Sequence, residues 1–214
     1  SSGVARGQGR IQGHPERFVR NGDSRGSGPR RPADRPGAIR ADGTGGFNTA
    51  EWQEARLDID ASVQPDVTGT MTDMAAVATA SVDAIFSSHN IEHLYPHEVP
   101  VALAEFVRVL KDDGMVLITC PDLQSVCARV AQGELASPLY DSPAGPIAAL
   151  DILYGHRPAM AAGNLYMAHR CGFTRKLLAD TLQACGFLRT AGVARPPAFD
   201  LWMLGTKKSL SDDA

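Results

Sequence analysis

The segment 81–121, SVDAIFSSHNIEHLYPHEVPVALAEFVRVLKDDGMVLITCP, constrains the fold of this chain more than any other segment. An unbroken apolar run at 82–86 precedes an amphipathic stretch, a Lys-Asp-Asp-Gly turn and a second apolar run at 115–120. This order predicts a strand, a helix and a second strand, because short apolar runs between turn residues are typical of buried strands. The polar cluster SSHN follows the first strand directly. Open α/β sheets bind ligands at the carboxyl ends of their strands, so we expect a site there.

The rest of the chain continues this alternation. Expected helices cover 74–80, 96–111, 123–130 and 175–184, and expected strands cover 55–60, 82–87, 115–120, 188–193 and 199–205. Strands that alternate with helices favour a Rossmann-like α/β fold with a doubly wound, mostly parallel sheet. The last two strands are expected to differ in direction, because their close spacing predicts a C-terminal hairpin with one antiparallel strand.

The composition divides the chain into unequal parts. Residues 1–46 are expected to be a largely irregular segment that is rich in Arg, Gly and Pro, since the first 40 residues contain nine arginines, no lysine and three acids. Residues 47–208 are expected to form one domain, with a long loop or lid at 137–172, and 209–214 form a tail. A chain of 214 residues is consistent with a single domain.

The same composition excludes several classes of protein. No apolar run is long enough to span a membrane, and no signal peptide is visible, so we expect a cytoplasmic protein without a membrane partner. The four cysteines show no CxxC spacing and are expected to be reduced, mostly buried thiols. The basic arm could contact phosphates, but the remainder is acidic, which disfavours nucleic acid as a partner. A small-molecule substrate is the remaining expectation.

Acidic residues follow the early strands. Asp58 and Asp60 end the strand at 55–60, where a carboxylate can accept hydrogen bonds from a ribose diol. Their alternative role is that of solvated acids at a strand end. Asp73 stands beside the backbone N–H of Met74, and such a pair can bind an adenine ring. The alternative role of Asp73 is to cap the N-terminus of a helix.

Ionisable side chains also follow the strand at 82–87. His89 and Asn90 are expected to line the ligand crevice, whereas Glu92 and His93 could simply begin the next helix. The spacing HNIEH also matches the HxxEH signature of zinc peptidases. That signature needs a helix, and Pro96 follows too closely for a helix interior, so no metal is expected.

Four segments together resemble the class I S-adenosylmethionine-dependent methyltransferases, in particular small bacterial members without an assigned substrate. They are LDID at 57–60, TMTDM at 70–74, VDAIFSSHNIEHL at 82–94 and EFVRVLKDDGMVLITCPDL at 105–123. MAHRCGFT at 167–174 and the closing hairpin are also similar to this family. The resemblance covers about residues 47–208.

The resemblance implies a seven-stranded sheet with S-adenosylmethionine across the strand ends. It assigns the ribose hydroxyls to Asp58, with Asp60 as the second choice, and the adenine to Asp73 and Met74. His89 and Asn90 would lie near the methionine moiety or the acceptor. The lid would cover the substrate and contact it through four residues: Tyr154, His156, Arg157 and His169.

The glycine-rich turn that opens this family's fold is weak in this chain. Gly26 and Gly28 are its candidate remnants, but residues 17–23 are a poor buried central strand. A degenerate turn could impair cofactor binding, which leaves a non-catalytic binding or assembly module as the alternative function. A dinucleotide oxidoreductase is disfavoured, because no GxGxxG lies between a strand and a helix.

The expected reaction is methyl transfer from S-adenosylmethionine to an unidentified acceptor. The sulfonium is an activated donor, so the protein would supply mainly orientation of the reactants. His89 is the expected general base, because an imidazole titrates near neutral pH. Asn90 is the second residue predicted for the catalytic site.

Overall fold

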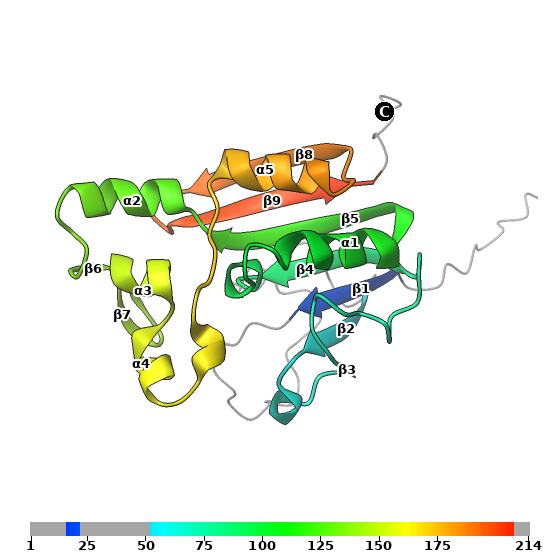
Figure 1. Ribbon diagram of the computed structural model, residues 1–214, viewed down its shortest axis with the longest axis horizontal. Helices are drawn as coiled ribbons and strands as arrows, with labels where there is room; N and C mark the ends of the chain where they lie inside the picture. The colour runs from blue at the N-terminus through cyan, green and yellow to red at the C-terminus, as the bar shows by residue number, and fades with distance from the viewer. Residues whose placement is uncertain (1–15, 22–51, 208–214) are drawn as a thin grey trace, which may run out of the picture.

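The fold is built on one seven-stranded sheet, seen in a computed structural model that describes residues 16–21 and 52–207 (Figure 1). The strand order is β3-β2-β1-β4-β5-β9-β8. The strands of this sheet, in chain order, are β1 (Glu16–Asn21), β2 (Trp52–Asp58), β3 (Val67–Thr68), β4 (Val82–Ser88), β5 (Leu110–Pro121), β8 (Arg189–Arg195) and β9 (Asp200–Thr206). Strands β1 to β5 pair in parallel, whereas β9 is antiparallel to both β5 and β8. The sheet is therefore mixed, and the predicted C-terminal hairpin is confirmed.

Two helices cover one face of this sheet. They are α1 (Val99–Val109) and α5 (Arg175–Ala184), which lie on the same side in Figure 1. Leu103 and Phe106 of α1 and Leu178 and Leu182 of α5 belong to the same buried core cluster. Their spacing of three or four residues puts them on one side of each helix, and each such burial contributes roughly 1.5–3 kcal/mol. The doubly wound arrangement, with helices on both faces, stays a prediction.

The start of α5 follows from its sequence. The side chain of Thr174 accepts a hydrogen bond from the backbone N–H of Leu177, which satisfies one of the free donors of the first turn. After the helix, Gly186 adopts a φ of +108°. Glycine tolerates this left-handed conformation and ends the helix there. The predicted helix at 175–184 is confirmed with both of its boundaries.

Strand β1 occupies the middle of the sheet, between β2 and β4. The sequence suggested that residues 17–23 are poorly suited to such a position, and this expectation is wrong for Glu16–Asn21. The last residue of β1, Asn21, pairs with Leu57 of β2 and with Ser87 of β4. The carboxyl ends of these three strands therefore meet at one edge. The remainder of the segment 1–46 lies outside the described residues.

Other predicted elements differ from the structure. The expected helix at 74–80 is a series of turns, in which the N–H of Val77 donates to the carbonyl oxygen of Met74. Helix α1 begins three residues later than predicted and ends before Leu110, where β5 starts at once. The expected turn at 111–114 is therefore part of a strand.

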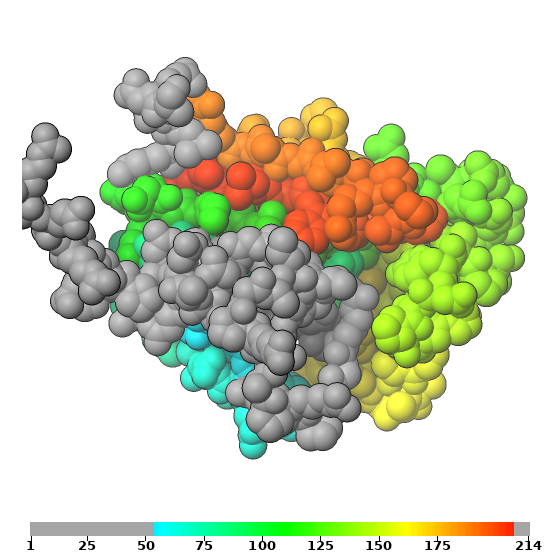
Figure 2. Space-filling view, turned by 180° about the vertical axis from the view of Figure 1, so that it is seen from behind, coloured from blue at the N-terminus to red at the C-terminus, as the bar shows by residue number. Residues whose placement is uncertain are grey.

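The segment 137–172 is a small folded module and not a bare loop. It contains the hairpin of β6 (Pro138–Ser142) and β7 (Gly145–Ala148), followed by α3 (Ala149–Tyr154), α4 (Arg157–Ala161) and the 3₁₀ turn η3 (Leu165–Met167). With α2 (Leu123–Ala131) it encloses a second core of Val126, Ile147, Ala149 and Ile152. Figure 1 shows the module beside the end of the sheet where β4 and β5 terminate, and Figure 2 shows its surface, yellow-green to yellow, at one end of the molecule.

Two further expectations concern the described residues. None of their helices has the length and apolar character needed to cross a lipid bilayer. All four cysteines are free thiols: Cys120 is buried, Cys127 is exposed, and Cys171 and Cys185 are half-buried. The predicted reduced state agrees with this, but only one of the four is fully buried.

Candidate functional site

The segment after β4 turns sharply inward. Ser87 and Ser88 end the strand in buried positions, and His89 then adopts a φ of +50° while its N–H donates to the carbonyl oxygen of Thr119 at 2.9 Å. A 3₁₀ turn, η2 (Ile91–His93), follows and is separate from α1. Because of this turn Glu92 points into the protein and is only 1% exposed. The interpretation of Glu92 and His93 as the start of the next helix is therefore wrong.

A distant segment of the chain docks against this turn. The backbone N–H groups of Arg170 and Cys171 both donate to the carbonyl oxygen of Glu92, at 2.8 and 3.2 Å. The guanidinium of Arg170 donates to the carbonyl oxygen of His93 at 3.0 Å, and the thiol of Cys171 donates to that of Ile91 at 3.2 Å. These four bonds fix the 168–171 segment on η2 and bring His169 beside His93.

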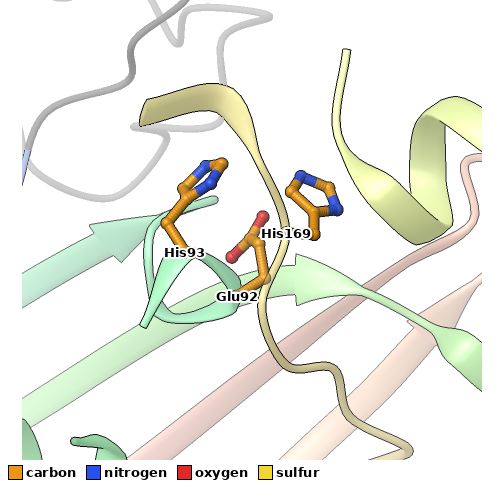
Figure 3. Close-up of side chains that lie close together, drawn as sticks. All are labelled: Glu92, His93 and His169. Atoms are coloured by element: carbon orange, nitrogen blue, oxygen red, sulfur yellow. The ribbon is translucent and has the colours of Figure 1, made fainter. Parts of the chain in front are cut away.

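Four side chains form what we call the imidazole–carboxylate cluster: His89, Glu92, His93 and His169. Figure 3 shows the Glu92 carboxylate between the rings of His93 and His169. One potential ligand atom from each of these three residues lies within 4.8 Å of the others, and the two ring centroids are 4.9 Å apart. His89 approaches from the strand side, with Nδ1 3.2 Å from Glu92 Oε1.

The charges of this cluster follow from its burial and contacts. Burial raises the pKa of Glu92, but the hydrogen bond from His89 and the neighbouring imidazoles outweigh it and hold this pKa below its ordinary value. Burial lowers the pKa of His169, which favours its neutral form. Burial also raises the pKa of the Cys171 thiol to about 12, so this cysteine is not a thiolate nucleophile at neutral pH.

The acids predicted to bind ribose lie at the end of β2. Oδ1 of Asp58 accepts a hydrogen bond from the N–H of Asp60 at 2.9 Å. Oδ1 of Asp60 accepts from the N–H of Ser62 at 2.8 Å and caps the 3₁₀ turn η1 (Ala61–Val63). Hydrogen bonds from the Ser62 side chain and backbone lower the pKa of Asp60. The Asp60 carboxylate therefore stabilises a turn, and Asp58 is the better of the two candidates for binding ribose.

The residues predicted to bind adenine have local partners. Oδ1 of Asp73 accepts a hydrogen bond from the N–H of Ala75 at 3.1 Å, which stabilises the local turn. The N–H of Met74 donates to Oε2 of Glu105 at 2.8 Å, and the Met74 residue is 2% exposed. Glu105 is itself bound by Arg108. This pairing argues against the Met74 amide as the donor to adenine.

The four residues predicted to touch substrate do not act as a group. Arg157 is bound to Asp151 through two side-chain hydrogen bonds of 2.8 and 2.9 Å. Tyr154 is 62% exposed, and His156 precedes α4 at its N-cap position. Only His169 joins the imidazole–carboxylate cluster within the part of the chain that the structure describes.

Asn90 and the candidate glycines are the remaining predicted site residues. Asn90 is half-buried, and its Nδ2 donates to the carbonyl oxygen of Ser88 at 2.9 Å, which stabilises the turn after β4. The glycine candidates Gly26 and Gly28 lie outside the described residues.

The roles of Glu92 and His93 were not predicted from the sequence. One signal was present, because Glu92 stands between the apolar residues Ile91 and Leu94 and both of these are buried. A charged residue in such a position must either reach the surface or have a special environment. No pattern in the sequence indicated that His169 lies beside them, because 76 positions separate it from His93 in the chain.

Comparison with known proteins agrees with this architecture. Residues 48–118 match the family described as "Methyltransferase domain". The chain matches no curated protein. Among solved structures, the PH0226 protein from Pyrococcus horikoshii OT3 is similar with a TM-score of 0.54 and 11% identity, over 91% of this chain and 83% of that one.

Two further solved structures have the same fold. They are the CurJ carbon methyltransferase, with 12% identity, and the CMeT domain of the citrinin polyketide synthase, with 13% identity; both have a TM-score of 0.51. These similarities cover 91% and 92% of this chain, which spans about half of each of those chains, 49% and 48%. The family match thus covers residues 48–118, about a third of the chain, and the solved structures show the same fold over most of it.

Proposed function

We propose that this chain transfers a methyl group from S-adenosylmethionine to a small-molecule acceptor. The proposal depends on one observation: β2, β1 and β4 are parallel neighbours, with Asp58 at the end of the first and His89 directly after the last. Two strand spacings separate these ends, which is about 10 Å. Ligands of open α/β sheets bind across such an edge.

The residues at the end of β2 fit the nucleoside part of this cofactor. Oδ1 of Asp58 is occupied by the N–H of Asp60, while the described residues leave Oδ2 without a hydrogen bond. A free carboxylate oxygen in this position can accept a ribose hydroxyl, as acids at this place do in doubly wound folds. Asp73 remains the candidate for the adenine ring. The glycines proposed for the methionine end lie outside the described residues.

When bound, the cofactor supplies a methyl group that is already activated on a sulfonium. The remaining tasks are to orient an acceptor and, for an oxygen or nitrogen acceptor, to remove its proton. We assign proton removal to His89, which is partly exposed, with Asn90 supporting the turn that carries it. The ring of His89 is held by Glu92 on one side, and this contact fixes its direction.

The proposed contacts to the acceptor are the four residues predicted from the lid. His169 is the best-supported acceptor contact of those predicted, because the structure brings it beside His93. Tyr154 and His156 remain candidate contacts. Arg157 is the weakest of the four, because its guanidinium already neutralises Asp151.

Calorimetric titration with S-adenosylhomocysteine tests this function. The wild-type chain should bind it, and Asp58→Ala should weaken binding roughly 10- to 100-fold, because hydrogen bonds to a charged acceptor contribute about 1.5–3 kcal/mol. The matched control is Asp180→Ala, which removes an exposed acid of α5. His89→Asn should retain cofactor affinity and lose turnover once an acceptor is known, since Asn tolerates the positive φ at this position.

Two results would contradict the proposal. A folded wild-type chain that gives no binding heat would favour the non-catalytic binding or assembly module, together with a degenerate glycine turn. Equal affinities of the wild type and Asp58→Ala would show that the cofactor lies elsewhere.

A further inference from the structure

Glu92 is a buried carboxylate that is only half satisfied. One oxygen, Oε1, faces His89 Nδ1 at 3.2 Å, but the other, Oε2, is buried and has no hydrogen-bond partner among the described residues. A buried polar atom without a partner costs about 1–3 kcal/mol, and more when it is charged. Such an atom in a native structure needs an explanation, and a bound ion is one that its surroundings can test.

The two histidines beside Glu92 are held in one tautomer. Nδ1 of His93 lies 3.0 Å from the carbonyl oxygen of Ala168, and Nδ1 of His169 lies 2.7 Å from that of Ile152. A carbonyl oxygen only accepts, so each Nδ1 must carry a hydrogen and donate it. In the neutral rings, both Nε2 atoms then carry free lone pairs. Histidines that ligate metals are oriented by this same kind of bond to a backbone carbonyl.

We propose that Glu92, His93 and His169 bind one divalent metal ion, with zinc as the best chemical match. The ligand atoms would be Oε2 of Glu92 and Nε2 of each histidine. Two imidazoles and a carboxylate suit zinc, which takes three protein ligands and keeps a fourth position open in sites that bind water or substrate. Calcium and magnesium prefer oxygen ligands and fit this set less well.

The three residues are close enough to share one ion. Tetrahedral zinc with bonds of about 2.1 Å places its ligand atoms about 3.4 Å apart, and one potential ligand atom of each residue lies within 4.8 Å of the others. His93 and His169 are each partly exposed, so an ion can enter from solvent. His89 would keep its bond to Oε1 and orient the carboxylate, as second-sphere partners of metal-bound carboxylates do.

This site differs from the zinc-peptidase motif considered in the sequence. That motif would use His89 and His93 as the histidine ligands on one helix. Here η2 is a single 3₁₀ turn, His89 binds the carboxylate, and the second histidine ligand comes from the 168–171 segment. The proposed metal would lie beyond the end of β4, beside the methyl-transfer site. That relationship, but not the metal site itself, rests on the proposed function.

Zinc titration of the full-length, chelator-treated chain tests the site. Isothermal calorimetry and elemental analysis after dialysis should show one zinc ion per chain. His93→Gln and His169→Gln should each lower affinity by about 100-fold or more, since loss of a mere supporting residue already costs about 10- to 100-fold. His97→Gln, which removes an exposed histidine outside the cluster, should bind zinc like the wild type. Thermal melting of each variant verifies folding.

Cobalt substitution adds an independent measurement. A site with nitrogen and oxygen ligands should give visible d–d absorption without the thiolate charge-transfer band that cysteine ligands produce, and Glu92→Gln should abolish this spectrum. Absence of saturable binding in the wild type would overturn the proposal, as would equal binding by folded His93→Gln, His169→Gln and wild-type chains. Because the titration contains no S-adenosylhomocysteine, a negative result here does not affect the cofactor test, and failure of cofactor binding does not affect this one.

Discussion

Two buried acids, Asp151 and Glu92, have opposite surroundings. Asp151 is 6% exposed and accepts four hydrogen bonds, from the backbone N–H groups of Ala148 and Arg157 and from Nε and Nη2 of Arg157. Glu92 is 1% exposed and has one side-chain partner on Oε1, whereas Oε2 has no hydrogen-bond partner among the described residues. Asp151 has all of its charge compensated, whereas Glu92 has an unused acceptor.

The difference separates a structural carboxylate from a functional one. The Arg157 guanidinium holds the pKa of Asp151 down to about 2, although burial acts against this. Hydrogen bonds of this kind stabilise the junction between β7, α3 and α4 but leave no atom for a ligand. The incomplete set of hydrogen bonds around Glu92 stabilises the fold less and leaves its Oε2 atom available to bind a ligand. Burial alone therefore does not identify a functional acid.

The largest effect should come from Gly155, which lies between these two regions. A Cβ atom at this position would lie 1.9 Å from the carbonyl oxygen of Met167, and its φ is +101°. Gly155→Ala should therefore lower the free energy of unfolding by about 3 kcal/mol and displace the segment that carries His169. Urea denaturation measures this change.

The matched control for this variant is Gly163→Ala. Gly163 has a similar φ of +98°, but no atom lies within 4 Å of the added Cβ. This control should show the conformational cost alone, about 1 kcal/mol. Equal losses in the two variants would show that contact with Met167 contributes nothing.

Asp151→Asn should cost about 2 kcal/mol at pH 7. The asparagine keeps the shape of the side chain but loses the charged pair with Arg157, and the size follows from the depressed pKa of Asp151. Lys176→Gln is the control, because it breaks an exposed ion pair with Asp180 and should cost less than about 0.5 kcal/mol. If both variants lost the same small amount, Asp151 would not be the structural acid described above.

The free energy of unfolding at acid pH should also depend on the ion pair of Asp151 and Arg157. The pKa of Asp151 in the folded chain, about 2, lies below its ordinary value of 3.8. Its stabilisation is therefore complete above pH 3.8 and is lost as the pH falls toward 2. Unfolding measured between pH 5 and pH 2, roughly, should show a loss of about 2 kcal/mol in the wild type that Asp151→Asn lacks. Parallel pH curves for the two proteins would contradict this assignment.

Glu92→Gln should have the smallest effect on stability, less than about 1 kcal/mol in metal-free protein. The amide oxygen can accept the bond from His89, and the new amide N–H can donate to an imidazole Nε2. The change removes a buried charge that is only partly compensated, so little stability is lost. Denaturation in the presence of chelator measures it. A loss above about 2 kcal/mol would place Glu92 with Asp151 among the structural acids.

Much of the fold could be predicted from local sequence. The apolar run at 82–86 predicted β4, and the spacing of Leu178 and Leu182 together with Thr174 and Gly186 predicted α5. These features depend on neighbours in the chain, which is why sequence patterns report them. Strand β1 was missed because its residues lack the apolar pattern of a central strand, although its backbone pairs with β2 and β4.

The sequence by itself determined the alternation of strands and helices, the family resemblance, and the positions of Asp58 at the end of its strand and of His89 directly after its own. Tertiary structure alone decided which side chains meet. Arg157 pairs with Asp151, and the Met74 amide donates to Glu105. His169 lies beside Glu92 and His93. The physical reason is that periodicity and capping act over a few residues, whereas these contacts arise from backbone hydrogen bonds between segments that are distant in the chain. A buried charge acquires its role from those contacts.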